Sequence, residues 1–66
     1  MKEAFDKNGN KIECGMEVEM PVPNNSDIWN FDFVGTVEDI LDDGTIIVID
    51  QEFDCFQIEA SRVEIF

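Results

Sequence analysis

The feature that most constrains the fold is the alternation of apolar and polar residues between closely spaced turn-forming residues. Gly, Asn, Asp or Pro interrupts the chain at short intervals, and between these interruptions apolar residues recur mostly at every second position. A period of two is typical of half-buried β-strands, whereas a helix needs apolar residues three and four positions apart. The sequence therefore predicts an all-β fold.

The clearest alternation covers residues 12–20. Apolar residues occupy the even positions, namely Ile12, Cys14, Met16, Val18 and Met20, and glutamates fill most of the odd ones. This pattern predicts a single strand with a charged outer face. Pro21 and Pro23 end the strand, because proline cannot donate a ladder hydrogen bond. The polar run Asn24-Asn25-Ser26-Asp27 follows, in what we expect to be the longest loop.

Further strands are expected in the second half of the chain. In a strand over residues 33–41 the alternation breaks after Val37, which indicates a bulge. Asp43-Gly44 can take the positive φ values of a two-residue hairpin turn. The strand over residues 45–50 is apolar on both faces and is the best candidate for the middle of the sheet. The expected remainder is a turn at 51–54, a strand at 55–58, a helical turn at 59–62 and a strand at 63–66.

Length and charge limit the size of the domain and the class of partner. A chain of 66 residues has room for one core, so residues 1–66 are expected to form a single domain. The hydrophobic fraction of 44% supports folding despite a net charge of -12.

The charge also bears on the class of partner. The chain has sixteen acidic residues and only four basic ones, Lys2, Lys7, Lys11 and Arg62. Because nucleic-acid affinity depends largely on Lys and Arg, we expect no nucleic-acid partner. Repulsion among the acids should make added salt and mild acid stabilising.

The sequence also bears on location and on the cysteines. The first residues lack the apolar run of a secretory signal, and no stretch approaches the roughly 20 apolar residues of a membrane span. We expect a cytoplasmic monomer without membrane contact. Cys14 and Cys55 are expected to be reduced, half-buried thiols, because the sparse cysteines do not form a disulfide framework.

Four segments together resemble a known class of small proteins. The segments NGNKIECGMEVEM, FVGTVEDI, DGTIIVID and FQIEASRVEIF are similar to those of small SH3-like barrel proteins of uncharacterised function from bacteria and phages. The resemblance covers nearly the whole chain. It implies five to six short antiparallel strands in two packed orthogonal sheets, a one-turn helix before the last strand and usually a binding role. It implies no chemistry.

The segment DKNGNKIECGME, residues 6–17, has the alternating carboxylate and amide side chains of a calcium loop. A calcium loop needs glycine at its sixth position, but that position is Lys11 and the glycine is Gly9, at the fourth. We therefore expect a hairpin with Asn8-Gly9 at its tip, in which Asp6 and Asn10 bond to local backbone. No metal or other cofactor is expected. The alternative is a weak divalent ion held by surface charge alone.

The chain has few side chains that could carry out catalysis. Histidine and tyrosine are both absent, and neither Ser26 nor Ser61 has a plausible base nearby in the sequence. A pair of carboxylates could act as acid and base only if an apolar cleft raised the pKa of one of them, and a small barrel offers little cleft. We expect the protein not to be an enzyme.

The segment DIWNFDF, residues 27–33, is the most informative for function. In an extended chain Trp29, Phe31 and Phe33 share one side, and Asp27 and Asp32 flank them. Aromatic rings beside acids suit a groove for a basic or proline-containing peptide. In SH3-like barrels this loop also borders the common ligand surface, so the resemblance points the same way. The alternative is that the aromatic side chains plug the core, with Phe33 in the core and Trp29 the most exposed of the three.

These observations lead to three hypotheses. The first is a non-catalytic binding module for a basic protein or peptide segment, in which Trp29 and Phe31 anchor the ligand and Asp27 and Asp32 steer it. The second is an acidic inhibitor that imitates nucleic acid and blocks a DNA-binding or nuclease partner. The third is a nucleic-acid-binding barrel, which the net charge of -12 disfavours most.

Overall fold

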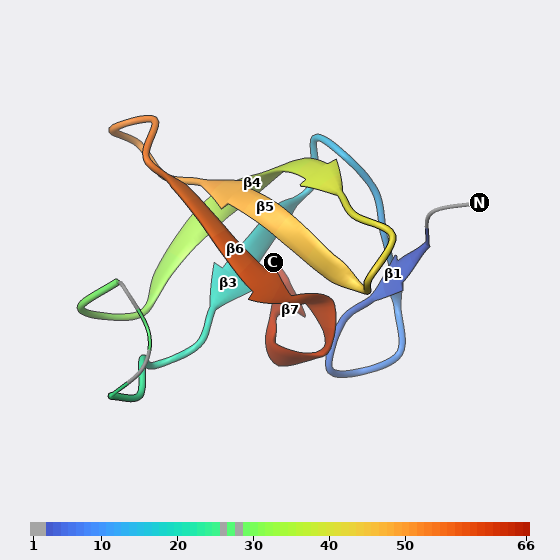
Figure 1. Ribbon diagram of the computed structural model, residues 1–66, viewed down its shortest axis with the longest axis horizontal. Coiled ribbons are helices and arrows are strands. Elements are labelled where there is room, and N and C mark those ends of the chain that lie inside the picture. Colours follow the sequence, from blue (N-terminus) through green and yellow to red (C-terminus); the bar gives the residue numbers. More distant parts are fainter. Residues whose placement is uncertain (1–2, 26, 28) are drawn as a thin grey trace.

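The structure, a computed structural model, describes residues 3–25, 27 and 29–66 and is all-β (Figure 1). Lys2 and Ser26, which were named above, lie outside the described residues. The elements are β1 (Ala4–Phe5), β2 (Lys11–Ile12), β3 (Glu17–Met20), β4 (Phe33–Ile40), β5 (Thr45–Ile49), β6 (Cys55–Glu59), the 3-10 turn η1 (Ala60–Arg62) and β7 (Glu64–Ile65). In the described part of the chain no helix is long and apolar enough to span a membrane.

The strands form one large and one small antiparallel sheet. The large sheet has five strands in the order β6-β5-β4-β3-β7, and β1 pairs with β2 in the small one. β7 returns across the molecule to lie beside β3, where Val18 faces Ile65. No described strand joins the two edges, β6 and β7, so the sheet is not closed. The expected two orthogonal sheets are therefore one curved sheet and a short hairpin (Figure 1).

The break of alternation in β4 is a bulge, as predicted. The pairing with β5 shifts between Val37 and Asp39. The extra residue turns the strand, so that Val37 and Ile40, three positions apart, are both buried. A regular strand would have placed these two side chains on opposite faces.

The prediction of one strand over residues 12–20 was wrong. A turn separates β2 from β3, in which the Met16 amide donates to the Glu13 carbonyl at 3.2 Å and Gly15 has φ 92°. Glycine adopts this positive φ without strain, so Gly15 allows the chain to turn in the middle of the alternating pattern. Ile12 and Val18 on either side of the turn are nevertheless both fully buried.

Two further predictions about the strands need correction. Residues 41–44 form a wider connection than the expected two-residue turn: Gly44 has φ 86°, and Asp43 is not among the residues with positive φ. The Asp43 carboxylate accepts hydrogen bonds from the hydroxyl and the amide of Thr45 in this connection. These bonds lower the pKa of Asp43 against a smaller opposing effect of burial. β5 lies between two strands, but β4 occupies the middle of the sheet.

The predicted N-terminal hairpin forms and is attached to β7 by Asp6, but its tip is a three-residue loop instead of Asn8-Gly9. The Asp6 amide donates to the Asn10 carbonyl, the Gly9 amide donates to the Asp6 carbonyl, and Gly9 but not Asn8 has positive φ. Ala4 faces Ile12 and Phe5 faces Lys11 across the hairpin. The Asp6 side chain, in a residue only 4% exposed, accepts hydrogen bonds from the amides of Asn8, Asn10 and Ile65 at 2.9, 2.8 and 3.1 Å. Burial acts to raise the pKa of Asp6, but these hydrogen bonds outweigh it and hold the pKa below its ordinary value.

The core draws residues from both sheets and from η1. Its buried apolar residues are Ala4, Ile12, Val18, Met20, Trp29, Val37, Ile40, Ile46, Val48, Ile58, Ala60 and Val63.

Cys14 and Cys55 are both free thiols, but both are exposed, and the prediction that they are half-buried was wrong. Cys14 is exposed because the turn at residues 13–16 takes it out of the expected strand, and Cys55 because it lies on the exposed face of β6, which alternates with the face of Phe56 and Ile58.

Candidate functional site

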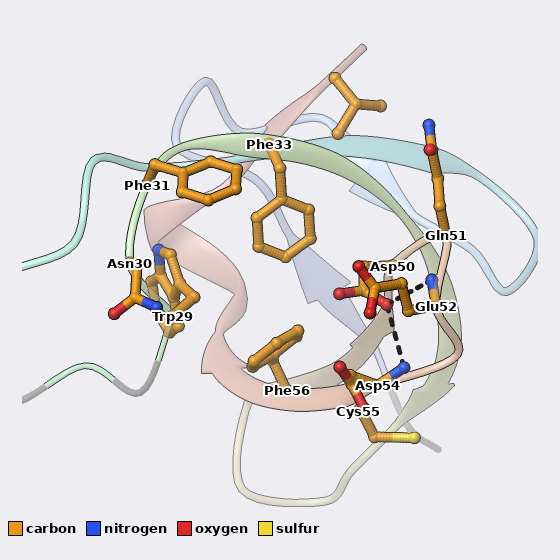
Figure 2. Close-up of a pocket in the computed structure, with 11 residues that line it drawn as sticks. Trp29, Asn30, Phe31, Phe33, Asp50, Gln51, Glu52, Asp54, Cys55 and Phe56 are labelled. Carbon is orange, nitrogen blue, oxygen red and sulfur yellow. Dashed lines mark hydrogen bonds between the residues drawn. The ribbon is translucent and has the colours of Figure 1, made fainter.

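A groove of about 670 Å³ opens between the end of the β3–β4 connection and the β5–β6 turn. The rings of Trp29, Phe31, Phe33 and Phe56 surround one side of it, and Asp50, Glu52 and Asp54 stand on the other (Figure 2). These two walls come from segments about 20 residues apart in the chain, which the curvature of the sheet brings to the same end (Figure 1). The groove therefore combines aromatic and acidic side chains.

Trp29 forms the buried end of the groove. It is only 6% exposed, and its ring meets the Phe56 ring edge to face, with the ring centres 6.1 Å apart. The indole N–H donates to the Pro21 carbonyl at 3.0 Å, so the polar atom of the side chain has a partner although the ring is buried. The prediction that Trp29 would be the most exposed of the three aromatic residues was wrong, and Trp29 plugs the core.

Phe31 and Phe33 take different positions in the groove. Phe33 is half-buried, packs against the core and lies with its ring centre 5.4 Å from that of Phe56. Phe31 is 68% exposed and stands at the rim, close to Trp29 in Figure 2. The plug and the groove were alternatives in the sequence, but the structure contains both: Trp29 serves the core, and Phe31 is left facing solvent.

Asp27 is engaged within the chain. Arg62 donates two hydrogen bonds to its carboxylate, at 3.1 and 2.9 Å, and the Asp27 side chain is only 8% exposed. The bonds from Arg62 and from the Asn24 amide lower the pKa of Asp27 against a smaller opposing effect of burial. The Arg62 guanidinium also lies 5.7 Å from the centre of the Trp29 ring. Asp27 and Trp29 thus already hold one cation of the protein itself.

Of the acids predicted for the site, Asp32 is exposed but does not line the groove. The acids that do line it are Asp50, Glu52 and Asp54 of the β5–β6 turn, which the sequence did not point to as site residues. One Asp50 carboxylate oxygen accepts hydrogen bonds from the amides of Glu52 and Asp54, at 2.8 and 3.0 Å. An aspartate at the start of a turn is a signal for that backbone arrangement. It carries no signal that an aromatic loop lies opposite.

Phe53 occupies the tip of the same turn in an unusual conformation. Its φ is 63°, and its side chain is 81% exposed. The Phe53 amide donates to the Asp50 carbonyl at 3.1 Å, which closes the turn. A bulky residue at positive φ is an outlier that the surrounding hydrogen bonds must hold in place. The Asp50 carboxylate supplies these bonds on both sides of Phe53.

The arrangement of the groove suits a cation with an apolar stem. Carboxylates attract a positive charge, and aromatic faces bind guanidinium and ammonium groups. Across the described ranges, no three histidine, cysteine, aspartate or glutamate side chains come together as a metal-binding group. No protein-family model, curated protein or solved structure matches this chain.

Proposed function

We propose that this protein is a non-catalytic binding module that takes up a basic protein or peptide segment in the groove between residues 29–33 and 50–56. The observation that carries the proposal is Phe31, an aromatic side chain 68% exposed beside three other rings and facing the acids of the β5–β6 turn. Phe53 and Phe66 are exposed too, but Phe31 lines a groove with other aromatic rings, and aromatic side chains grouped at a concave site are typical anchors of an interface.

Charge favours a basic partner over other classes. The net charge of -12 repels polyanions such as nucleic acids and attracts cations from a distance. Arg62 provides an example within the chain, because its guanidinium sits between the Asp27 carboxylate and the Trp29 ring. A partner arginine or lysine at the open side of the groove would meet a similar pair of surfaces, formed by Phe31 or Phe33 and by Asp54 or Glu52.

We infer further that the fold is a small SH3-like barrel. The order β6-β5-β4-β3-β7, the long connection between β3 and β4 and the 3-10 turn before the last strand support this inference. In that fold the long loop borders the usual ligand surface, which agrees with the place of the groove. The proposal includes no catalysis, cofactor, nucleic acid or membrane, and it assigns the protein to the cytoplasm as a monomer.

The test is the binding of a short arginine- and proline-containing peptide, followed by the fluorescence of Trp29, the single tryptophan of the chain. Phe31→Ala should weaken binding by about tenfold, the effect of an interface anchor. Phe66→Ala is the matched control, because Phe66 is 76% exposed and does not line the groove. An acidic peptide of the same length should not bind.

The charges on the groove wall are tested in the same way. Glu52→Gln should weaken binding more than Glu13→Gln, which removes the same charge from an exposed residue outside the groove. Equal effects of these two variants, together with a neutral Phe31→Ala, would speak against the groove. They would favour the alternative of an acidic inhibitor that imitates nucleic acid, in which total negative charge matters more than any aromatic side chain.

A further inference from the structure

The β6 edge of the large sheet has backbone groups without a partner strand. β6 pairs with β5 on one side only, and its register runs without a shift from the pair Ile49–Cys55 to the pair Thr45–Glu59. Just outside the two ends of this ladder, the Asp50 amide donates to the Asp54 carbonyl and the Ala60 amide donates to the Gly44 carbonyl. These two bonds show which residues of β6 direct their N–H and C=O groups toward β5 and which direct them away from it.

In an antiparallel pair, residues that exchange hydrogen bonds alternate with residues that do not. Because residues 54 and 60 bond toward β5, Phe56 and Ile58 bond toward it as well. Cys55 and Gln57 therefore direct their N–H and C=O groups away from β5. Among the described residues, no strand lies on that side of β6.

The opposite edge of the sheet is covered, unlike the β6 edge. At β7 the Asp6 carboxylate accepts a hydrogen bond from the Ile65 amide at 3.1 Å. The Lys7 amide donates to the carbonyl of Val63, the residue just before β7, at 2.9 Å. Proteins commonly protect an edge strand with proline, lysine or a bulge. β6, with the sequence CFQIE, has none of these devices.

The open edge is continuous with the groove. Cys55 and Phe56, the first two residues of β6, line the groove together with the preceding Asp54 (Figure 2). The charges beside the edge are acidic, at Asp54 and Glu59, so a second copy of this chain would meet its own repulsion there. A basic segment would meet attraction.

We propose that the partner segment binds as an extended strand that adds to β6, with its backbone bonded to Cys55 and Gln57 and its apolar side chains entering the groove beside Phe56. This mode of recognition draws affinity from main-chain hydrogen bonds and specificity from alternate side chains. The inference depends on the proposed function, because it specifies how the same basic partner is held. Arginine or lysine at alternate positions of the segment would complement the acids along the edge.

The first test is amide hydrogen exchange of the full chain with a short peptide in which arginine alternates with valine. In the free protein, the amides of Cys55 and Gln57 should exchange fast and those of Phe56 and Ile58 slowly. Saturating peptide should slow exchange at Cys55 and Gln57 by at least about tenfold. Trp29 fluorescence reports binding independently.

The outcomes separate the two proposals. If the peptide binds but exchange at Cys55 and Gln57 is unchanged, the edge inference is wrong and the proposed function stands. If this peptide does not bind, the edge inference is wrong, and the arginine- and proline-containing peptide decides separately whether the proposed function is wrong as well. If these two amides become protected when the protein alone is concentrated, the occupant of the edge is a second copy, and the inference is again overturned.

A second test replaces the outward N–H of the edge. Gln57→Pro removes this donor at an edge position, where proline is tolerated because no ladder bond is lost. It should weaken peptide binding by about tenfold, whereas Gln57→Ala, which loses the same side-chain bond to Thr45, should stay within about twofold. If Gln57→Pro does not fold, a peptide N-methylated at alternate residues tests the same main-chain hydrogen bonding, because N-methylation removes N–H donors of the peptide. Equal affinity of the methylated and unmethylated peptides would contradict the inference.

Discussion

Arg62 and Asp27 form a two-point ion pair between the 3-10 turn and the β3–β4 connection, with N–O distances of 3.1 and 2.9 Å. The pair is partly buried: the Arg62 side chain is 32% exposed and the Asp27 side chain 8%. Because the same guanidinium lies over the Trp29 ring, the pair holds the long connection against the core at the end where the groove opens.

The first prediction concerns the geometry of this pair. Arg62→Lys keeps the charge but loses the planar fork that bonds both carboxylate oxygens. The melting temperature should fall by about 4–8 °C, the shift expected for one hydrogen bond in a small domain. Lys7→Gln is the control, because it breaks an exposed ion pair with Glu64 at 3.5 Å that should contribute little. Equal shifts for both variants would contradict the structural role of the Asp27 pair.

The second prediction concerns acid. The pKa values of Asp6, Asp27 and Asp43 are lowered from 3.8 in the folded protein, so these groups bind fewer protons folded than unfolded. Their stabilisation is complete above the unfolded pKa and is lost as pH falls through the lower folded values. Urea midpoints should therefore drop below about pH 4.

Asp6→Asn should flatten this acid drop more than Asp32→Asn does, because Asp32→Asn removes a charge from an exposed residue. If the urea midpoint falls by the same amount in both variants below pH 4, the hydrogen bonds to Asp6 do not cause the acid sensitivity. The shifts of these three acids are opposite to those expected from crowding of like charges. The prediction that salt and mild acid stabilise the fold applies to a separate range, pH 7 to 5.5, and the same melts with added sodium chloride measure it.

The third prediction concerns Gly35, a buried residue of β4 opposite Val18. A Cβ at this position would lie 2.5 Å from Val48 Cγ1 and 2.7 Å from the Ile49 carbonyl oxygen. Gly35→Ala should therefore lower the free energy of unfolding by about 1–3 kcal/mol, the usual cost of overpacking. In a Val48→Ala background this cost should shrink by at least about 0.5 kcal/mol, because one of the two clashes is removed. Strict additivity in urea melts would show that the Val48 side chain is not the obstacle.

The fourth prediction concerns the backbone at Phe53. Asn tolerates positive φ and a β-branched residue does not, so Phe53→Asn and Phe53→Val should differ by about 1–2 kcal/mol in stability, with the Asn variant the more stable. Both variants remove the same exposed ring, so the difference isolates the φ of 63°. Variants of equal stability would mean that the turn relaxes to negative φ at no cost.

Local pattern was sufficient for most of the strands and turns. The hairpin around Gly9, the bulge after Val37, the turn at residues 51–54 and the 3-10 turn at residues 60–62 all depend on residues close together in the chain. The division of residues 12–20 into two strands was missed, because Gly15 lies at an odd position and leaves the alternation intact. A glycine inside a strand pattern is compatible with either a strand or a turn, and only the pairing with Val37 on β4 decides between them.

That this chain is all-β and acidic could be predicted from the sequence alone, since period-two alternation, turn residues and a net charge of -12 are local or summed properties. Which aromatic is buried depended on the tertiary structure. Trp29 is buried because the Pro21 carbonyl, Arg62 and Phe56 surround it, whereas Phe31, two residues further on, is 68% exposed. The acids that face the aromatic rings likewise come from a turn distant in the chain. Contacts between distant segments follow from how the sheet curves and pairs, and no spacing along the chain encodes them.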